Sequence, residues 1–313
     1  MKKANRLFIF AGYDRDNIVD ATLIYYLKSL SELGDIVFTM DNDLSDSELH
    51  KISQIPNVLH ASAMRHGEYD FGSYKRGYIW ARDKKILDKY AWVYLVNDSV
   101  LGPLFNLENT LKNLEASGAD FFGMVECVDS KMPNHIQSWF VGLSRCIAMD
   151  SRFDEFITSI APESVKSVIV YKYEMRLTKM LASCGYKYCA IYQDSDATLY
   201  RHPWRVIDCG VPFIKKLSFG INNKIQFLYP YLSPQMLLNI NQWAHRTNTA
   251  LCPDPEMLRA SYHKLHRFAL LGVPLMTVYQ QLSIDNTVSY KVCAFNNIPI
   301  LKFSTKTQGG IKS

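Results

Sequence analysis

Short apolar runs alternate with helical segments over the first two thirds of the chain, and this alternation constrains the fold most. The expected strands are 7–10, 36–40, 58–60, 92–96, 120–125, 139–143 and 188–192. Helices are expected between them at 17–33, 74–90 and 165–183. Strands separated by helices predict an α/β fold, with a mainly parallel sheet that helices cover on both faces. Ligands bind such folds beyond the carboxyl ends of the strands.

The chain changes character near residue 200, where strands become harder to recognise. Residues 213–285 are expected to be mostly helical, with prolines dividing the pieces. We predict a domain at 1–205, followed by a mostly helical basic C-terminal extension at 206–313. With 313 residues, 48% of them hydrophobic, the chain can fill a large core, which excludes a disordered protein.

Charge is distributed unevenly along the chain. The net charge is +5, yet residues 201–313 carry 13 Lys and Arg against 4 Asp and Glu. Such a segment suits contact with phosphates or with an anionic membrane surface, although an ordinary solvated basic surface explains it equally well. Nucleic acid would give the same charge signature, but no recognition motif is present, so no nucleic-acid partner is expected.

The apolar runs and the cysteines indicate the compartment. No apolar run reaches the length that crosses a bilayer, and the basic start is followed by too few apolar residues for a signal peptide. Seven cysteines form no CxxC pair, which favours reduced thiols over disulfides or a zinc site. We expect a cytoplasmic protein, with peripheral contact at the inner face of the membrane as a further expectation.

A polar motif follows the apolar strand expected at 92–96. Asn97, Asp98 and Ser99 come at its carboxyl end, where an α/β sheet presents ligand groups. A carboxylate with small polar neighbours suits a hard divalent cation, while capping of the next turn is the structural alternative. The segment 41–43 has the pattern Asp-x-Asp, which could hold a metal or contact a nucleotide. It lies in a polar loop where turn formation alone explains these residues, and this interpretation is favoured.

A glycine-rich segment at 65–77 is the second candidate. Its basic residues, Arg65, Lys75 and Arg76, could bind a diphosphate, and its glycines permit close approach of the backbone. Ser73 is expected to cap the following helix, whose N-terminus favours anions. The segment also contains Asp70, and Gly12 opens a ligand-facing loop after the first strand.

Two further groups of polar residues accompany the expected strand at 139–143 and the expected helix at 165–183. His135, Gln137 and Ser138 precede the strand, and Trp139 begins it, available either to stack on a sugar ring or to pack inside. Glu174 lies near the start of a helix with an apolar face. Without further context, the simpler interpretation of Glu174 is a solvent-exposed surface glutamate.

The order of these motifs resembles the rhamnan synthesis F family, bacterial glycosyltransferases of surface polysaccharide assembly. The resemblance rests on the segments 69–74, 97–99 with 102–103, 135–140, 173–178 and 210–215, and it extends over roughly residues 5–220. It implies a GT-A-like fold, in which residues 1–205 form a nucleotide-sugar-binding catalytic domain. The donor implied is a nucleotide sugar, commonly dTDP-L-rhamnose, and no organic cofactor is implied.

The resemblance also implies roles for individual residues. In GT-A enzymes an acidic motif at a strand end holds a divalent cation, Mg²⁺ or Mn²⁺, against the donor diphosphate. Asp98 occupies that position, but the third residue of its motif is Ser99, which leaves metal dependence open. Glu174 matches the position of the catalytic base of inverting members, three residues before Leu177.

The expected function is therefore transfer of a sugar, L-rhamnose from dTDP-L-rhamnose, to a saccharide acceptor by an inverting single displacement. The acceptor could be lipid-linked. The alternative is a non-catalytic nucleotide-sugar-binding scaffold subunit of a polysaccharide assembly complex. Besides the base Glu174, the expected donor-binding residues are Gly12, Arg65, Asp70, Ser73, Lys75, Arg76, Asn97, Asp98 and Ser99, and the expected sugar-binding or acceptor-binding residues are His135, Gln137, Ser138 and Trp139.

Overall fold

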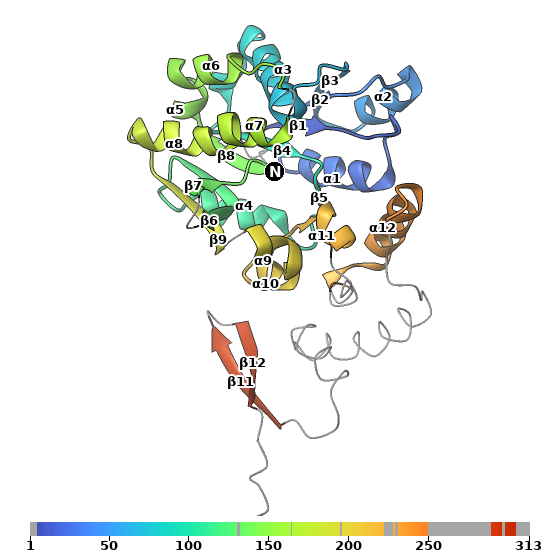
Figure 1. The fold of residues 1–313 in the computed structure, drawn as a ribbon, viewed down its shortest axis with the longest axis vertical. Helices are drawn as coiled ribbons and strands as arrows, with labels where there is room; N and C mark the ends of the chain where they lie inside the picture. Colours follow the sequence, from blue (N-terminus) through green and yellow to red (C-terminus); the bar gives the residue numbers. More distant parts are fainter. Residues whose placement is uncertain are drawn as a thin grey trace, which may run out of the picture.

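The computed structural model describes residues 5–129, 132–163, 165–194, 196–221, 228, 231–249, 289–295 and 298–304. Its centre is an eight-stranded sheet in the order β3-β2-β1-β4-β8-β6-β7, with β9 also paired to β6 (Figure 1). The strands are β1 Arg6–Gly12, β2 Asp35–Met40, β3 Val58–Ala63, β4 Trp92–Asn97, β6 Phe121–Asp129, β7 Met132–Ile136, β8 Phe140–Ser144 and β9 Tyr188–Asp194.

Most of these strands run in one direction. The pairs β1–β2, β2–β3, β1–β4 and β6–β9 are parallel, and β8 and β7 are the antiparallel members. The predicted mainly parallel α/β sheet is therefore confirmed. The antiparallel β7 was not predicted, because its sequence contains Pro133 and lacks an apolar run.

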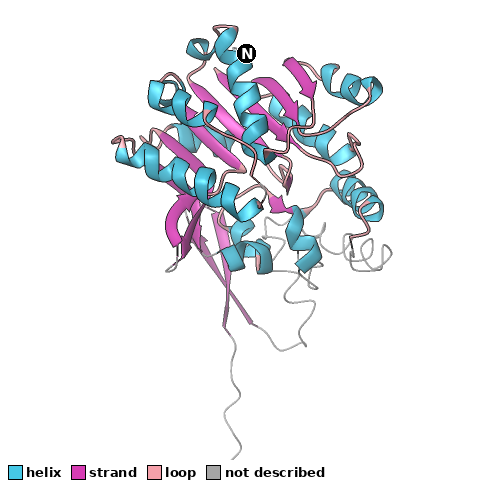
Figure 2. Ribbon diagram, turned by 45° about the horizontal axis from the view of Figure 1, so that its top comes forward, coloured by secondary structure: helices cyan, strands magenta, loops and turns pink. Residues whose placement is uncertain are grey.

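Helices cover both faces of the sheet (Figure 2). One face packs on α1 Ala21–Ser31, α2 Asp46–Ser53 and α4 Leu107–Glu115, and the other on α3 Tyr69–Asp83, η1 Leu87–Lys89, α5 Arg145–Ala148, α6 Ser151–Thr158 and α8 Arg176–Ser183. Strand β1 shows why both faces are apolar. Phe8 and Phe10 enter the first core, whereas Leu7, Ile9 and Ala11 enter the second, as the two-residue period of a strand requires.

A π-helical segment interrupts the helix expected at 165–183. The structure places α7 at Lys166–Ile169, η2 at Val170–Met175 and then α8. Glu174 lies on η2, whose wider turn is frequent at functional sites. The first predicted helix is also shorter than expected, because Asp20 caps α1 by accepting hydrogen bonds from the backbone N–H groups of Thr22 and Leu23.

The segment after residue 200 returns to the central domain. β10 Ile214–Lys215 pairs antiparallel with β5 Val100–Leu101, which directly follows the polar motif after β4. Helices α9 Asp196–Arg201, α10 Pro203–Asp208, α11 Lys216–Ile221 and α12 Pro234–Arg246 surround this pair. A third apolar cluster, which includes Leu101, Ile214 and Trp243, joins them to the domain.

Two features bear on the predicted extension. Helix α10 spans the proposed boundary at residue 205, and the boundary itself stays a prediction. Strands β11 Ser289–Phe295 and β12 Ile298–Ser304 form an antiparallel hairpin that was not predicted.

Within the described residues, no helix is both long enough and apolar enough to span a bilayer.

Candidate functional site

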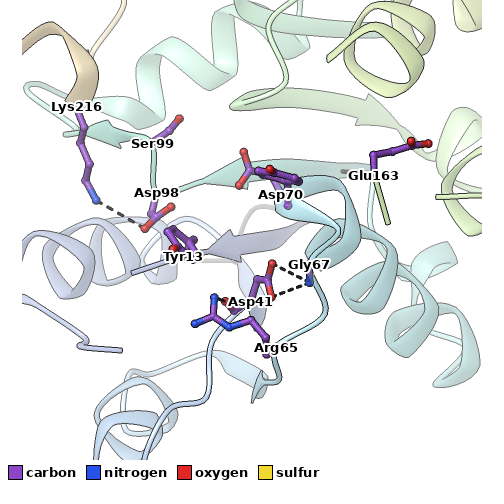
Figure 3. Close-up of a pocket in the computed structure, with 10 residues that line it drawn as sticks. Tyr13, Asp41, Arg65, Gly67, Asp70, Asp98, Ser99, Glu163 and Lys216 are labelled. Carbon is purple, nitrogen blue, oxygen red and sulfur yellow. Dashed lines mark hydrogen bonds and ion pairs between the residues drawn. The ribbon is translucent and has the colours of Figure 1, made fainter. Parts of the chain in front are cut away.

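A pocket of about 530 Å³ lies at the carboxyl ends of β1, β2 and β4 (Figure 3). This is the edge of the sheet where parallel strands present ligand groups. Each strand end contributes a residue, and the loop before α3 and the start of α11 close the sides. The lining residues are Tyr13, Asp41, Arg65, Gly67, Tyr69, Asp70, Asp98, Ser99, Glu163 and Lys216. Four of the expected donor-binding residues are among them: Arg65, Asp70, Asp98 and Ser99.

The loop after β4 is held by its own polar groups. Asn97 is buried, and its Nδ2 donates to Asp70 Oδ2 at 2.8 Å. Asn97 Oδ1 accepts from the backbone N–H of Ser99 at 3.0 Å and from its hydroxyl at 2.6 Å. Asn97 therefore links the two sides of the pocket and fixes the backbone around Asp98, although it is not among the lining residues.

Asp98 faces a lysine from the C-terminal part of the chain. Its Oδ2 lies 3.7 Å from Lys216 Nζ (Figure 3). Burial raises the pKa of Asp98, and the nearby carboxylates of Asp20 and Asp14 add to this, while Lys216 and the backbone N–H of Tyr13 act in the opposite direction. The raised pKa shows that burial outweighs the attraction of the lysine.

Asp41, at the end of β2, organises the loop that follows β3. Its carboxylate accepts from the backbone N–H of His66 at 2.7 Å and from that of Gly67 at 3.1 and 3.2 Å. Gly67 has a φ of +68°, a conformation that glycine adopts without strain. The guanidinium of Arg65 donates to the carbonyl of Asp41 at 2.9 Å and lies 5.6 Å from the ring centroid of Tyr13. Arg65 is therefore held beside the pocket.

The other basic residues of segment 65–77 are occupied elsewhere. Lys75 Nζ and Arg76 Nη1 lie 2.7 and 2.6 Å from the same carboxylate oxygen, Glu68 Oε2. We call Glu68, Lys75 and Arg76 the Glu68 cluster. Burial acts to raise the pKa of Glu68, but the hydrogen bonds from Arg76 and Lys75 lower it overall. Neither basic residue lines the pocket, so the structure does not bring them to the expected diphosphate site.

Ser73 and Gly12 also lie outside the pocket lining. The prediction that Ser73 caps α3 is wrong, because the helix begins four residues earlier, at Tyr69. Ser73 is buried, and its hydroxyl lies 3.0 Å from His66 Nε2. A Cβ at Gly12 would lie 3.1 Å from the side chains of Met40 and Phe38, so the residue serves close packing of β1 on β2. Its neighbour Tyr13 reaches the pocket.

The residues expected to bind the sugar or acceptor are buried beside the sheet. His135 Nδ1 lies 3.0 Å from the carbonyl of Pro133, and Trp139 Nε1 donates to Gln137 Oε1 at 2.7 Å. The Trp139 ring packs on Phe140 and Phe213 in the first core. Of the two alternatives for Trp139, the structure shows packing inside. None of the residues expected to bind the sugar or acceptor lines the pocket.

Glu174 lies outside the pocket lining and is linked to Tyr74 through Ser138. Its Oε1 accepts from the backbone N–H of Ser138 at 2.7 Å, and the Ser138 carbonyl accepts from the Tyr74 hydroxyl at 2.9 Å. Burial raises the pKa of Tyr74 well above its usual range, and the charges of Asp70 and Glu174 raise it further. Both carboxylates therefore lie near the same phenol.

Several pocket residues were absent from the predicted site. Tyr13 and Glu163 carried no sequence signal, whereas Tyr69 stands in the segments 65–77 and 69–74 but was not singled out as a site residue. Asp41 belonged to the Asp-x-Asp segment 41–43, for which turn formation was the favoured interpretation. Lys216 directly follows the motif at 210–215, and only the pairing of β10 with β5 places it beside Asp98.

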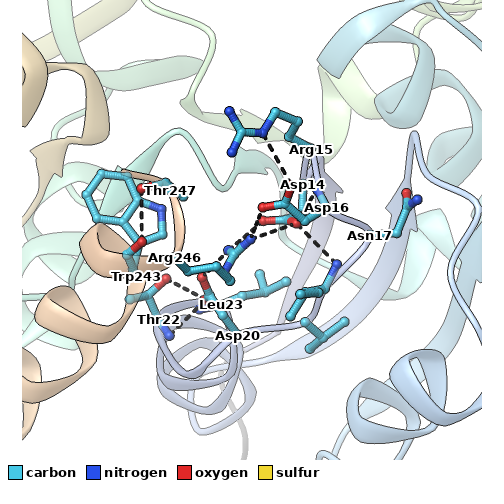
Figure 4. A network of polar contacts seen from close by, with 12 residues as sticks. Asp14, Arg15, Asp16, Asn17, Asp20, Thr22, Leu23, Trp243, Arg246 and Thr247 are labelled. Atoms are coloured by element: carbon cyan, nitrogen blue, oxygen red, sulfur yellow. Dashed lines mark hydrogen bonds and ion pairs between the residues drawn. The ribbon is translucent and has the colours of Figure 1, made fainter. Parts of the chain in front are cut away.

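A second polar network ties the C-terminal part of the chain to the loop after β1 (Figure 4). Arg246, the last residue of α12, donates to Asp14 at 2.7 and 3.0 Å, to Asp16 at 3.0 Å and to Asp20 at 2.8 Å. Burial acts to raise the pKa of Asp20, but Lys216, Thr22, Leu23 and Arg246 lower it overall. The network fixes the loop that carries Tyr13 into the pocket.

The donor set around Asp98 does not fit the expected divalent cation. In the part of the chain that the structure describes, no three His, Cys, Asp or Glu side chains form a group that could hold a metal ion. Asp98 instead faces the ammonium of Lys216, and the Ser99 hydroxyl accepts from Lys215 Nζ at 2.8 Å. A cation bound by Asp98 would have to approach these positive charges.

Residues 36–245 match the family described as rhamnan synthesis protein F, which covers more than half of the chain. This chain belongs to that family. The predicted resemblance is thereby confirmed, and the protein is placed among those of rhamnan synthesis. No curated protein matches the chain.

Two solved structures resemble part of the chain. Core-mannan synthase A (CmsA/Ktr4) from Aspergillus fumigatus, in an Mn/GDP-form, has 9% sequence identity and a TM-score of 0.33, over 55% of this chain and 67% of its own. The mannosyltransferase Ktr4p from S. cerevisiae has 9% identity and a TM-score of 0.33, over 56% of this chain and 63% of its own. At these values neither likeness says what this chain binds.

Proposed function

We propose that this protein is a glycosyltransferase of rhamnan-type surface polysaccharide synthesis that binds a nucleotide sugar in the pocket beyond β1, β2 and β4. The observation that carries the proposal is the pocket itself. It combines two cations, Arg65 and Lys216, with carboxylates such as Asp41 and Asp70 in a chain of the rhamnan synthesis family. Cations suit a diphosphate, and carboxylates suit the hydroxyls of a ribose or a sugar.

The donor we propose is dTDP-L-rhamnose, in keeping with the family, and the acceptor is a saccharide that could be lipid-linked. The acceptor hydroxyl attacks the anomeric carbon, and Glu174 accepts its proton. The bond between that carbon and the diphosphate oxygen breaks, and the nucleoside diphosphate leaves with the electron pair. A single displacement of this kind inverts the anomeric centre.

Glu174 does not line the pocket, and its proposed role as the base rests on its match to the base position of the family. One carboxylate oxygen is fixed by the N–H of Ser138, and the residue is partly exposed. Glu174→Gln keeps an acceptor for that N–H but cannot take a proton, so we expect kcat to fall about 10²–10⁴-fold with little change in donor affinity. Glu155→Gln, on the exposed surface of α6, is the matched control.

Asp70 provides the comparison that assigns the base. It lines the pocket and accepts from Asn97, so Asp70→Asn should weaken donor binding more than it lowers kcat. If Asp70→Asn abolished turnover while Glu174→Gln retained it, the base would be Asp70, and the assignment of Glu174 as the base would be wrong.

Binding is tested first by thermal unfolding with dTDP, UDP, GDP and dTDP-L-rhamnose. A ligand at 100 times its Kd adds about 2.7 kcal/mol to the free energy of unfolding. For a chain of this size that raises Tm by a few degrees. A shift with none of these nucleotides, in either Mg²⁺ or EDTA, would overturn the transferase proposal. Binding without turnover of any acceptor would support the scaffold alternative. Ser99, in place of an acidic residue at the third position of the motif at 97–99, favours that alternative.

A further inference from the structure

The loop after β4 and the start of α11 are joined at three points. The carbonyl of Ser99 accepts from the backbone N–H of Lys216 at 2.9 Å, and the Ser99 hydroxyl accepts from Lys215 Nζ at 2.8 Å. The third point is the ion pair between Asp98 and Lys216. The first two contacts hold the backbone of Lys216 beside the loop after β4 without the carboxylate of Asp98.

Lys216 has donor capacity that the ion pair does not use. Its Nζ lies 3.7 Å from Asp98 Oδ2, beyond hydrogen-bond distance, and an ammonium carries three N–H donors. The side chain is 21% exposed and lines the pocket. Figure 3 shows it entering from the side of β10 and α11, whereas Arg65 enters from the loop after β3. The two cations therefore approach the pocket from different elements.

We propose that Lys216 takes the place of the divalent cation, so that its ammonium, with the guanidinium of Arg65, neutralises the diphosphate of the bound nucleotide. This inference rests on the proposed function, since it requires a nucleoside diphosphate in the pocket. It assigns Lys216 as a catalytic residue that stabilises the leaving group, and it makes the reaction independent of Mg²⁺ and Mn²⁺.

The two kinds of site predict opposite behaviour of Asp98. At a metal site the carboxylate is the ligand, and Asp98→Asn would abolish binding. At a lysine site the carboxylate competes with the nucleotide for Lys216, while the backbone of Ser99 still holds the lysine in place. Asp98→Asn should then bind dTDP in EDTA with a Kd within about threefold of wild type or tighter.

The experiment is calorimetric titration of the full-length protein with dTDP, UDP and GDP, in EDTA and in Mg²⁺. We expect the Kd of the best nucleotide to agree within about twofold between the two buffers. Lys216→Met should raise that Kd about 10- to 100-fold, the value of a charge-assisted hydrogen bond. Lys216→Arg should retain most of the affinity. Lys112→Met, which removes the same charge from the exposed surface of α4, is the control and should bind as wild type does.

The outcomes separate this inference from the proposed function. Binding by the wild type in Mg²⁺ but not in EDTA would show that Lys216 does not replace the divalent cation. The proposed glycosyltransferase function would not be contradicted by that result. The same holds for a folded Lys216→Met that binds with wild-type affinity. Absence of binding for all three nucleotides in both buffers would overturn both. The comparison of EDTA with Mg²⁺ uses only the wild type, so it decides the question even where a variant does not fold.

Discussion

The Glu68 cluster and the pair of Asp98 with Lys216 contain similar residue types within one domain, yet they differ in geometry. In the Glu68 cluster, two cations lie 2.6 and 2.7 Å from one carboxylate oxygen, and neither lines the pocket. Lys216 lies 3.7 Å from Asp98 and lines the pocket. Tight ion pairs satisfy their charges internally, so they stabilise the fold, whereas a loosely paired cation can still bind an anion.

Glu68→Gln removes the charge that holds the Glu68 cluster and should have the largest effect on stability. The carboxylate is buried, and its loss leaves two cations without their partner. Since Lys75 and Arg76 are partly exposed, we expect the free energy of unfolding to fall by about 2 kcal/mol, less than for a fully buried pair. Denaturant unfolding measures this change.

Nucleotide binding by Glu68→Gln tests whether the Glu68 cluster, unlike the pair of Asp98 with Lys216, lies outside the binding site. Below its own Tm, the folded Glu68→Gln protein should bind the nucleotide with wild-type affinity, since Lys75 and Arg76 lie outside the pocket. A Kd that changes tenfold or more with unchanged stability would show that the Glu68 cluster belongs to the binding site after all.

Arg246→Ala tests the polar network between α12 and the loop after β1. We expect it to lower the free energy of unfolding less than Glu68→Gln does. The change leaves Asp14, Asp16 and Asp20 close together without their guanidinium. Because these groups are partly exposed, we expect a loss of about 1–2 kcal/mol in the free energy of unfolding, measured by denaturant titration. Arg152→Ala, which removes an exposed ion pair with Asp150, is the control and should cost less. Equal losses in the two variants would contradict a structural role for the Arg246 network.

The Arg246 network also contributes to the pH dependence of stability. The pKa of Asp20 is lower in the folded protein than its ordinary value, so the ionised form is favoured by folding. Its contribution is present above about pH 4 and is lost as the pH falls through the lowered pKa. Lys216 lowers this pKa most, and Arg246 contributes after Thr22 and Leu23. Arg246→Ala should therefore lose slightly less stability than wild type between pH 4 and pH 2, as measured by urea unfolding at each pH.

His66 gives the smallest expected effect, near neutral pH. Burial lowers its pKa, and the charge of Arg76 lowers it further, against the opposing effect of Asp41 and Glu68. His66 Nδ1 accepts from the backbone N–H of Glu68 at 3.0 Å, so protonation would break that bond. The unfolded chain binds this proton more readily, and stability should therefore fall as the pH drops from about 7 through 6.5 toward 5.

The variant His66→Asn distinguishes the effect of protonating His66 from the effects of other titrating groups. The amide oxygen can accept from the same N–H but does not titrate, so the slope of the free energy of unfolding between pH 7 and 5 should become smaller. An unchanged slope would show that another group binds the proton. The measurement is urea unfolding at several pH values, with His50→Asn on the surface of α2 as the control.

The fold class and the edge of the sheet where the pocket lies could both be predicted from the amino-acid sequence. Apolar runs such as 92–96 can be buried on both faces only in a sheet covered by helices, and the polar residues after them must then meet at the strand ends. Asp98 and Ser99 were identified in this way, whereas Arg65 and Asp70 were identified from the glycine-rich segment 65–77.

Which charged side chains face the pocket could not be predicted, because this depends on how distant segments pack together. Lys75 and Arg76 look like ligands in the sequence, but their helical positions direct them to Glu68. Lys216 is far from Asp98 in the sequence, and the pairing of β10 with β5 brings the two together. Side-chain direction on a helix and contacts between distant strands depend on packing of the whole chain, and the charges of a short segment do not specify them.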